Sequence, residues 1–149
     1  YQVRAVSAKG VHSFISEPLR VYSDASIQQV DIDKWLDNEL GEQVKVKVSI
    51  PATGWYVVDW EYANGSGEVE QRNHCANRQL YIDGKNKETM VFPQRGLDDW
   101  TSYGWSSPVK VYLKKGTHQI ALRYLEKNIN INIDIDKAHV KSLRLTQLP

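Results

Sequence analysis

One segment of the chain gathers the side chains with the greatest capacity for chemistry. Residues 95–105 contain two Trp, one Tyr, two Asp and two Gly. The adjacent carboxylates favour a surface position, because an unpaired charge is costly to bury. Three large aromatic rings on a surface loop are typical of a binding site, where a ring stacks on the apolar face of a ligand. We expect Trp105 or Tyr103 to turn inward as an anchor, and Trp100, next to Asp99, to stay exposed as the stacking ring.

The sequence gives little support to catalysis. It lacks a glycine-rich phosphate loop, a Gly-x-Ser-x-Gly motif and a His-Glu-x-x-His motif. His74 and Cys75 are adjacent, but a zinc site needs further ligands that no spacing supplies. Three pairs of carboxylates are most simply solvent-facing, with a calcium site or a catalytic acid–base pair as alternatives. These pairs are Asp31/Asp33, Asp98/Asp99 and Asp134/Asp136. We therefore predict a chain that is not an enzyme, with a structural calcium ion left open.

The composition is that of an ordinary globular protein. The 149 residues are 41% hydrophobic and 25% charged, enough to bury a core without crosslinks. The formal net charge of +1 argues against a nucleic-acid binder that neutralises phosphates. No apolar run approaches the roughly 18 residues of a membrane helix. The single cysteine excludes an internal disulfide.

The elements that must position the aromatic segment are strands. Four stretches alternate apolar and polar residues, which predicts half-buried strands. They are residues 44–50, 56–62, 109–113 and 129–135. Only residues 32–40 fit a short helix, with Asp33 as its cap and Gly41 as its stop. Many short strands separated by turn residues predict an all-β fold, an antiparallel β-sandwich or jelly roll.

The first 22 residues have a character of their own. Residues 1–6 and 16–22 are predicted as two strands, with a turn at Ala8-Lys9-Gly10 between them. This pair resembles the last hairpin of a fibronectin type III domain. We therefore expect residues 1–22 to close one domain and residues 23–149 to form a separate β-sandwich module.

An ordered series of short motifs lies between residues 41 and 148. In chain order they are Gly54-Trp55-Tyr56, Tyr62-Ala63-Asn64-Gly65, Arg78-Gln79-Leu80-Tyr81-Ile82-Asp83-Gly84, Val91-Phe92-Pro93, Trp100-Thr101-Ser102-Tyr103, the hairpin over 111–120 and Asn132-Ile133-Asp134. The series resembles bacterial carbohydrate-binding modules of the galactose-binding-domain-like type, with families 6 and 35 the nearest. The resemblance implies a jelly roll that binds a polysaccharide or oligosaccharide and does not cleave it.

The resemblance also implies which residues hold the sugar. Trp100 matches the ring that stacks on the apolar face of a pyranose. Asp99 and Tyr103 supply polar groups beside it. Asn132 matches an amide that binds sugar hydroxyls, with Asn130 as the alternative if the register slips.

Three further residues complete the predicted sugar site. Trp35 is the only replacement for a second aromatic ring, because the early loop that normally donates one is short here. Tyr62 and Asn64 also match the motifs, with the alternative that they only build a strand end and its turn. An early Glu-x-Glu strand, which helps to hold calcium in the family, is not recognisable. This departure leaves the metal unknown.

The resemblance implies a setting as well. Such modules accompany the catalytic domain of a secreted or periplasmic bacterial enzyme that degrades polysaccharide, so we expect an export signal on an upstream segment. The competing hypothesis is a structural β-sandwich that packs on a neighbouring domain and has no sugar site. Trp100 distinguishes the two, because a binding module leaves this ring exposed to solvent and a spacer packs it against its neighbour.

Overall fold

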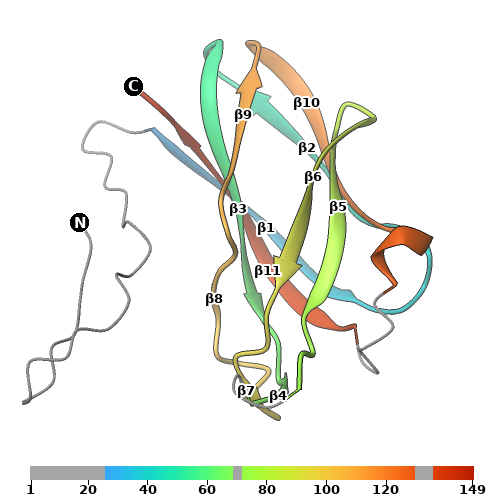
Figure 1. Cartoon of the computed structure of the whole chain (residues 1–149). Coiled ribbons are helices and arrows are strands. Elements are labelled where there is room, and N and C mark those ends of the chain that lie inside the picture. Colours follow the sequence, from blue (N-terminus) through green and yellow to red (C-terminus); the bar gives the residue numbers. More distant parts are fainter. Residues whose placement is uncertain (1–25, 69–71, 130–135) are drawn as a thin grey trace, which may run out of the picture.

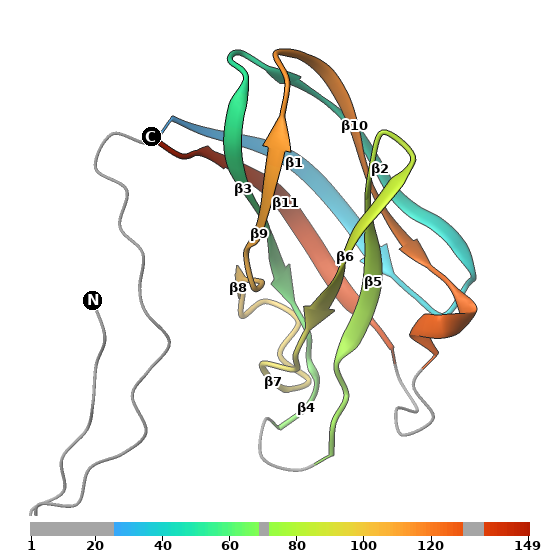
Figure 2. The same ribbon diagram turned by 45° about the horizontal axis from the view of Figure 1, so that its top comes forward.

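The computed structural model describes residues 26–68, 72–129 and 136–149, which form two antiparallel sheets packed face to face (Figures 1 and 2). The predicted fibronectin-like hairpin over 1–22 lies outside the described residues. The same holds for residues 130–135 of the predicted strand over 129–135. The all-β prediction is confirmed, and a short 3₁₀ turn is the only helix among the described residues.

The chain alternates between the sheets. The first sheet has the order β1-β11-β3, and both β8 and β9 pair with β3. The second sheet has the order β2-β10-β5-β6, and β4 pairs with β7 in a small separate ladder. The elements are β1 (Ile27–Leu36), β2 (Gly41–Ile50), β3 (Gly54–Ala63), β4 (Ser66–Gly67), β5 (Ala76–Ile82), β6 (Lys85–Phe92), β7 (Gly96–Leu97), β8 (Gly104–Trp105), β9 (Val109–Leu113), β10 (Gly116–Tyr124), η1 (Glu126–Asn128) and β11 (Ala138–Gln147).

The core lies between the two sheets and follows the alternation in the sequence. The predicted strands over 44–50, 56–62 and 109–113 are confirmed within β2, β3 and β9. Along β3 the inward side chains are aromatic or branched, and all of them are buried. They are Tyr56, Val58, Trp60 and Tyr62. Since side chains alternate across a strand, this pattern places the whole strand in one register against the second sheet.

The predicted helix over 32–40 is wrong. Its first half belongs to β1, which pairs with β11 from Ile27 to Leu36. The register shifts between Asp31 and Lys34, and Asp33 has φ = 49°, which a right-handed helix does not contain. Helix propensity is a weak preference, and pairing with a long neighbouring strand overrides it. The bulge bends the strand and aims Trp35 outward, whereas Leu36 enters the core.

The hairpin between β5 and β6 is fixed by Asp83 and Gly84, with φ of 51° and 75°, as a type I′ turn requires. The Asp83 carboxylate accepts hydrogen bonds from the Gln119 amide at 2.9 Å and from His118 Nδ1 at 2.6 Å. Burial opposes ionisation of both groups. The Gln119 amide and His118 nonetheless lower the pKa of Asp83, and the Lys114 carbonyl and Asp83 raise the pKa of His118.

We expect this pair to make stability depend on pH. The raised pKa of His118 contributes stability that is complete below its usual value of 6.5 and is lost as pH rises through the raised pKa. The lowered pKa of Asp83 contributes stability above its usual value of 3.8 and loses it as pH falls through the lowered pKa. Urea denaturation should show His118→Gln costing more at about pH 5 than at about pH 8. An equal cost at both values would contradict this assignment.

Candidate functional site

The aromatic segment is attached to the end of β3. The Arg95 amide donates to the Asn64 carbonyl and the Asp98 amide donates to the Gly65 carbonyl, each at 2.7 Å. The loop lies so close to Gly65 that a Cβ there would stand 2.8 Å from the backbone of Asp99 and 2.9 Å from Trp100 Nε1. A glycine is required at this position because the loop occupies the space of a side chain.

Asp99 shapes the loop from within. Its Oδ1 accepts hydrogen bonds from the Thr101 amide at 3.1 Å and from the Ser102 amide at 2.9 Å. The Thr101 hydroxyl donates to the same oxygen. These bonds lower the pKa of the Asp99 carboxyl, with the Thr101 amide as the largest cause. One oxygen of the predicted sugar contact therefore holds the turn between Trp100 and Tyr103.

The structure brings Trp35 and Trp100 together. Trp35 lies at the end of β1 with 54% of its surface exposed, and Trp100 is partly exposed. Their ring centroids are 5.1 Å apart, and their planes are tilted by 58°. Two large rings therefore share one area of the surface, although one comes from a strand and the other from the loop.

His139, at the start of β11, connects this ring pair to polar groups. Its ring centroid lies 4.7 Å from that of Trp35. Its Nε2 lies 2.9 Å from Asp33 Oδ1, and its Nδ1 lies 2.6 Å from the Tyr103 hydroxyl. Because a carboxylate only accepts, Nε2 donates to Asp33, while Nδ1 shares its hydrogen bond with the Tyr103 hydroxyl. We refer to Trp35, Trp100, Tyr103 and His139 as the Trp35–Trp100 cluster.

Two charged groups border the Trp35–Trp100 cluster. Asp33 contacts His139 from the bulge of β1, and the Asp33 side chain is 86% exposed. Lys141 places its Nζ 4.8 Å from the centroid of the Tyr103 ring. The arrangement can stack an apolar face on its rings and hydrogen-bond polar groups at its rim.

Trp105 does not turn into the core as expected, because its half-buried ring lies on the outer face of the first sheet. It pairs with Glu61 of β3, and the Arg144 guanidinium lies 3.7 Å from its ring centroid. Arg144 in turn donates through Nε to Asp59 at 2.9 Å on the neighbouring strand. Trp105 thus covers an ion pair on the outer face of the first sheet.

Other predicted site residues lie apart from the Trp35–Trp100 cluster. Tyr62 is 3% exposed and packs edge-on against Phe92, with centroids 5.2 Å apart. Asn64 is fully buried, and its amide donates to the carbonyls of His74 at 3.0 Å and Phe92 at 2.9 Å. Both residues build the strand end and its turn, so neither is part of the candidate site. The predicted Asn132 and its alternative Asn130 lie outside the described residues.

Sequence reasoning missed His139, and it treated Asp33 as a helix cap. No local motif marks His139, because its partners Tyr103 and Asp33 both lie more than 30 residues earlier in the chain. The alternation of the last strand could have indicated that His139 is exposed. His139 and Lys141 both point away from the core in a strand whose alternate residues are buried.

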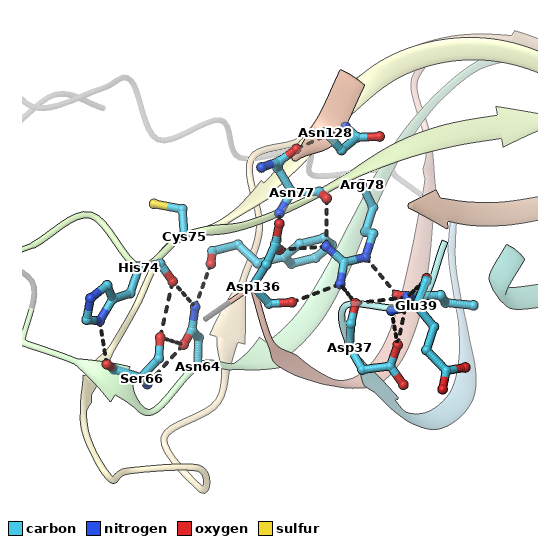
Figure 3. Close-up of polar contacts among 12 residues, drawn as sticks. Asp37, Glu39, Asn64, Ser66, His74, Cys75, Asn77, Arg78, Asn128 and Asp136 are labelled. Atoms are coloured by element: carbon cyan, nitrogen blue, oxygen red, sulfur yellow. Dashed lines mark hydrogen bonds and ion pairs between the residues drawn. The ribbon is translucent and has the colours of Figure 1, made fainter. Parts of the chain in front are cut away.

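A second polar cluster lies inside the sandwich around Arg78, which is fully buried (Figure 3). Its guanidinium donates to Asp136 Oδ1 at 2.6 Å and to Gln43 Oε1 at 2.7 Å. It also donates to the carbonyl oxygens of Asn77, Asp37 and Asp136. Burial lowers the pKa of Arg78, but a guanidinium still stays charged.

These oxygens bear on the question of calcium. A calcium ion needs six to eight oxygen ligands, whereas the Arg78 guanidinium takes up five of the oxygens that converge here and leaves Asp136 Oδ2 buried without a hydrogen bond. In the described ranges, no group of three or more His, Cys, Asp or Glu side chains could hold a metal ion. The described residues therefore do not fit a calcium ion at this place.

Comparison with known proteins gives one curated relative of note. A cycloisomaltooligosaccharide glucanotransferase of Niallia circulans is 31% identical over 105 residues, which cover 69% of this chain and 10% of that protein. The chain thus spans about a tenth of the relative's length. No protein-family model matches the sequence. Within the described residues, no helix is both long and apolar enough to cross a bilayer.

Solved structures identify the fold. A family 35 carbohydrate-binding module of Clostridium thermocellum matches with a TM-score of 0.53 at 20% identity, covering 82% of this chain and 91% of that one. A Paenibacillus cycloisomaltooligosaccharide glucanotransferase, solved with cycloisomaltoheptaose, matches with a TM-score of 0.55 at 22% identity, covering 80% of this chain and 18% of that one. The chain therefore has the galactose-binding-like jelly-roll fold of the family 35 carbohydrate-binding modules.

Proposed function

We propose that the chain is a non-catalytic module that binds a polysaccharide or oligosaccharide through the Trp35–Trp100 cluster. The observation that carries the proposal is the contact of two partly exposed Trp rings beside Tyr103 and His139. A pyranose has an apolar face of C–H groups, which stacks on such rings, and a belt of hydroxyls, which pairs with polar rims.

The polar groups of the cluster suit sugar hydroxyls. Asp33 accepts hydrogen bonds, and its side chain is largely exposed, so a hydroxyl can reach the oxygen that His139 leaves free. Lys141 supplies a donor next to the Tyr103 ring. The sugar would lie across the rings with its hydroxyls directed at these two charged groups.

The fold and the curated relative support an accessory role. Family 35 modules share the fold, and the relative is a much longer glucanotransferase. We propose that the module accompanies the catalytic domain of a bacterial carbohydrate-active enzyme that is secreted or periplasmic. The relative's name makes isomalto-linked glucans the first ligands to test. An export signal in the full-length gene product would agree with this placement, and its absence would contradict it.

The test is affinity gel electrophoresis of the chain in dextran, an isomalto-linked glucan, with a glycan array for other polysaccharides. We expect Trp100→Ala and Trp35→Ala each to keep the melting temperature and to weaken binding by about tenfold, because each loses a stacked ring worth roughly 1–3 kcal/mol. Tyr81→Ala is the control, since Tyr81 is a partly exposed ring on β5, in the other sheet.

The outcomes separate the two hypotheses. Binding that both cluster variants weaken and Tyr81→Ala leaves intact supports the sugar site. A Trp100→Ala chain that unfolds would make this ring part of the core. If the unaltered chain binds none of the polysaccharides, the result would favour a structural spacer.

A further inference from the structure

A second pair of exposed aromatic rings lies at the other end of β3. Trp55 and Tyr112 are paired across β3 and β9, with 48% and 54% of their surfaces exposed. Their ring centroids are 5.3 Å apart, and their planes meet at 71°. Trp55 is the second residue of β3, whereas the Trp35–Trp100 cluster packs beyond its last residue, so about 30 Å of strand separates the two places.

The Trp55–Tyr112 pair borders a groove along the open side of the sandwich. Two adjoining hollows of about 330 and 440 Å³ share Glu88, Val109 and Lys110 in their walls. They lie between β6 and β9, the strands at the edges of the two sheets. The open side of a sandwich thus presents two large rings at one end of a continuous depression.

The charges around the pair are mostly positive. Lys110 places its Nζ 4.7 Å from the centroid of the Trp55 ring. Lys114 is exposed and directly follows β9, two residues beyond Tyr112. Lys87 lines the groove from β6, where Glu88 is the single carboxylate. We refer to Trp55, Tyr112, Lys110, Lys114 and Lys87 as the Trp55–Tyr112 surface.

These features select among occupants. Lysines on edge strands hinder the addition of a further strand, which disfavours an extended peptide. A docked apolar domain would bury the ammonium groups without partners, at a high cost. A sugar chain with carboxylates avoids both problems, because its rings stack on Trp55 and Tyr112 and its carboxylates pair with the lysines.

We propose that the Trp55–Tyr112 surface is a second binding site and that it takes a carboxylate-bearing polysaccharide. Stacking supplies the contact area, and the lysines supply charge-assisted hydrogen bonds that a neutral chain does not make. The site differs from the Trp35–Trp100 cluster in place and in ligand class. It does not rest on the proposed function of that cluster.

The experiment measures binding of the chain to polygalacturonate and to the same polymer after its carboxyl groups are reduced. Polygalacturonate should bind, and the reduced polymer should bind at least about tenfold more weakly. We expect Trp55→Ala and Tyr112→Ala each to weaken polygalacturonate binding by about tenfold at unchanged melting temperature. Lys110→Gln should weaken binding and also reduce its dependence on salt concentration.

Two controls make the result specific. Trp35→Ala removes a ring of the other site and should leave polygalacturonate binding unchanged. Lys47→Gln removes an exposed lysine on β2, outside the groove, and should also leave it unchanged. Equal binding of the reduced polymer, an equal loss with either control, or no binding of the unaltered chain would each overturn the proposal.

Discussion

Arg78→Met is expected to destabilise the chain by about 3–5 kcal/mol, the cost of leaving one partner of a buried ion pair uncompensated. Arg78 is fully buried, and its partner Asp136 is 3% exposed. Methionine extends as far as the position of Nε and supplies no donor. The Asp136 carboxylate, the Gln43 side chain and three carbonyl groups would each lose a charged donor, and the Asn77 amide alone would not compensate the Asp136 charge. Urea denaturation measures the loss as a lower free energy of unfolding.

Two further variants identify the cause. Arg123→Met removes a partly exposed arginine that pairs with Glu42 on the surface, and it should cost about 1 kcal/mol or less. Combining Arg78→Met with Asp136→Asn removes the orphaned charge, so the double variant should be more stable than Arg78→Met alone. A loss below about 1 kcal/mol for Arg78→Met would mean that the ion pair adds little beyond its packing.

Asn64→Ala should cost about 2–4 kcal/mol, since an orphaned buried donor or acceptor costs roughly 1–3 kcal/mol and several lose their partner here. The Asn64 amide serves the carbonyls of His74 and Phe92, and its Oδ1 accepts from the Ser66 amide at 3.0 Å and from the Ser66 hydroxyl. Three segments therefore meet at one side chain (Figure 3). Thermal and urea unfolding measure the effect.

Asn64→Ala should also weaken sugar binding, because the loop that carries Trp100 is hydrogen-bonded to the backbone carbonyls of Asn64 and Gly65. Asn73→Ala is the matched control. Asn73 is exposed, and its carboxamide oxygen accepts one hydrogen bond, from the Cys75 amide at 3.1 Å. It should cost well under 1 kcal/mol, as a surface change does. Similar losses for both variants would contradict the assigned role of Asn64.

The strands were predictable wherever one face of the chain meets the core. Tyr56, Val58, Trp60 and Tyr62 alternate because every second position is buried, and this signal is local. β1 was not predictable in the same way. Its outward bulge at Asp33 breaks the alternation, and the partner strand that imposes it begins about 100 residues later.

The aromatic part of the candidate site was predictable, and its polar part was not. Trp100 and Tyr103 belong to a short segment rich in aromatic residues, and Trp35 was predicted as the replacement for a second stacking ring. His139 has no such signature, because its role depends on two strands meeting at the bulge of β1. The burial of Arg78 was hidden for the same reason, since its acceptors come from segments around residues 37, 43, 77 and 136.

The pairing of β1 with β11 also determines how the module can be attached to another protein. Ile27 faces Thr146 at one end of the ladder, and Trp35 faces His139 at the other, so the chain enters and leaves the sandwich side by side (Figure 2). About eight residues of strand, or roughly 25 Å, separate this entry and exit point from the Trp35–Trp100 cluster. The sandwich can therefore be inserted into a surface loop of an unrelated protein without a change in its strand order. The Trp35–Trp100 cluster would then lie at the end of the module that is farthest from the host.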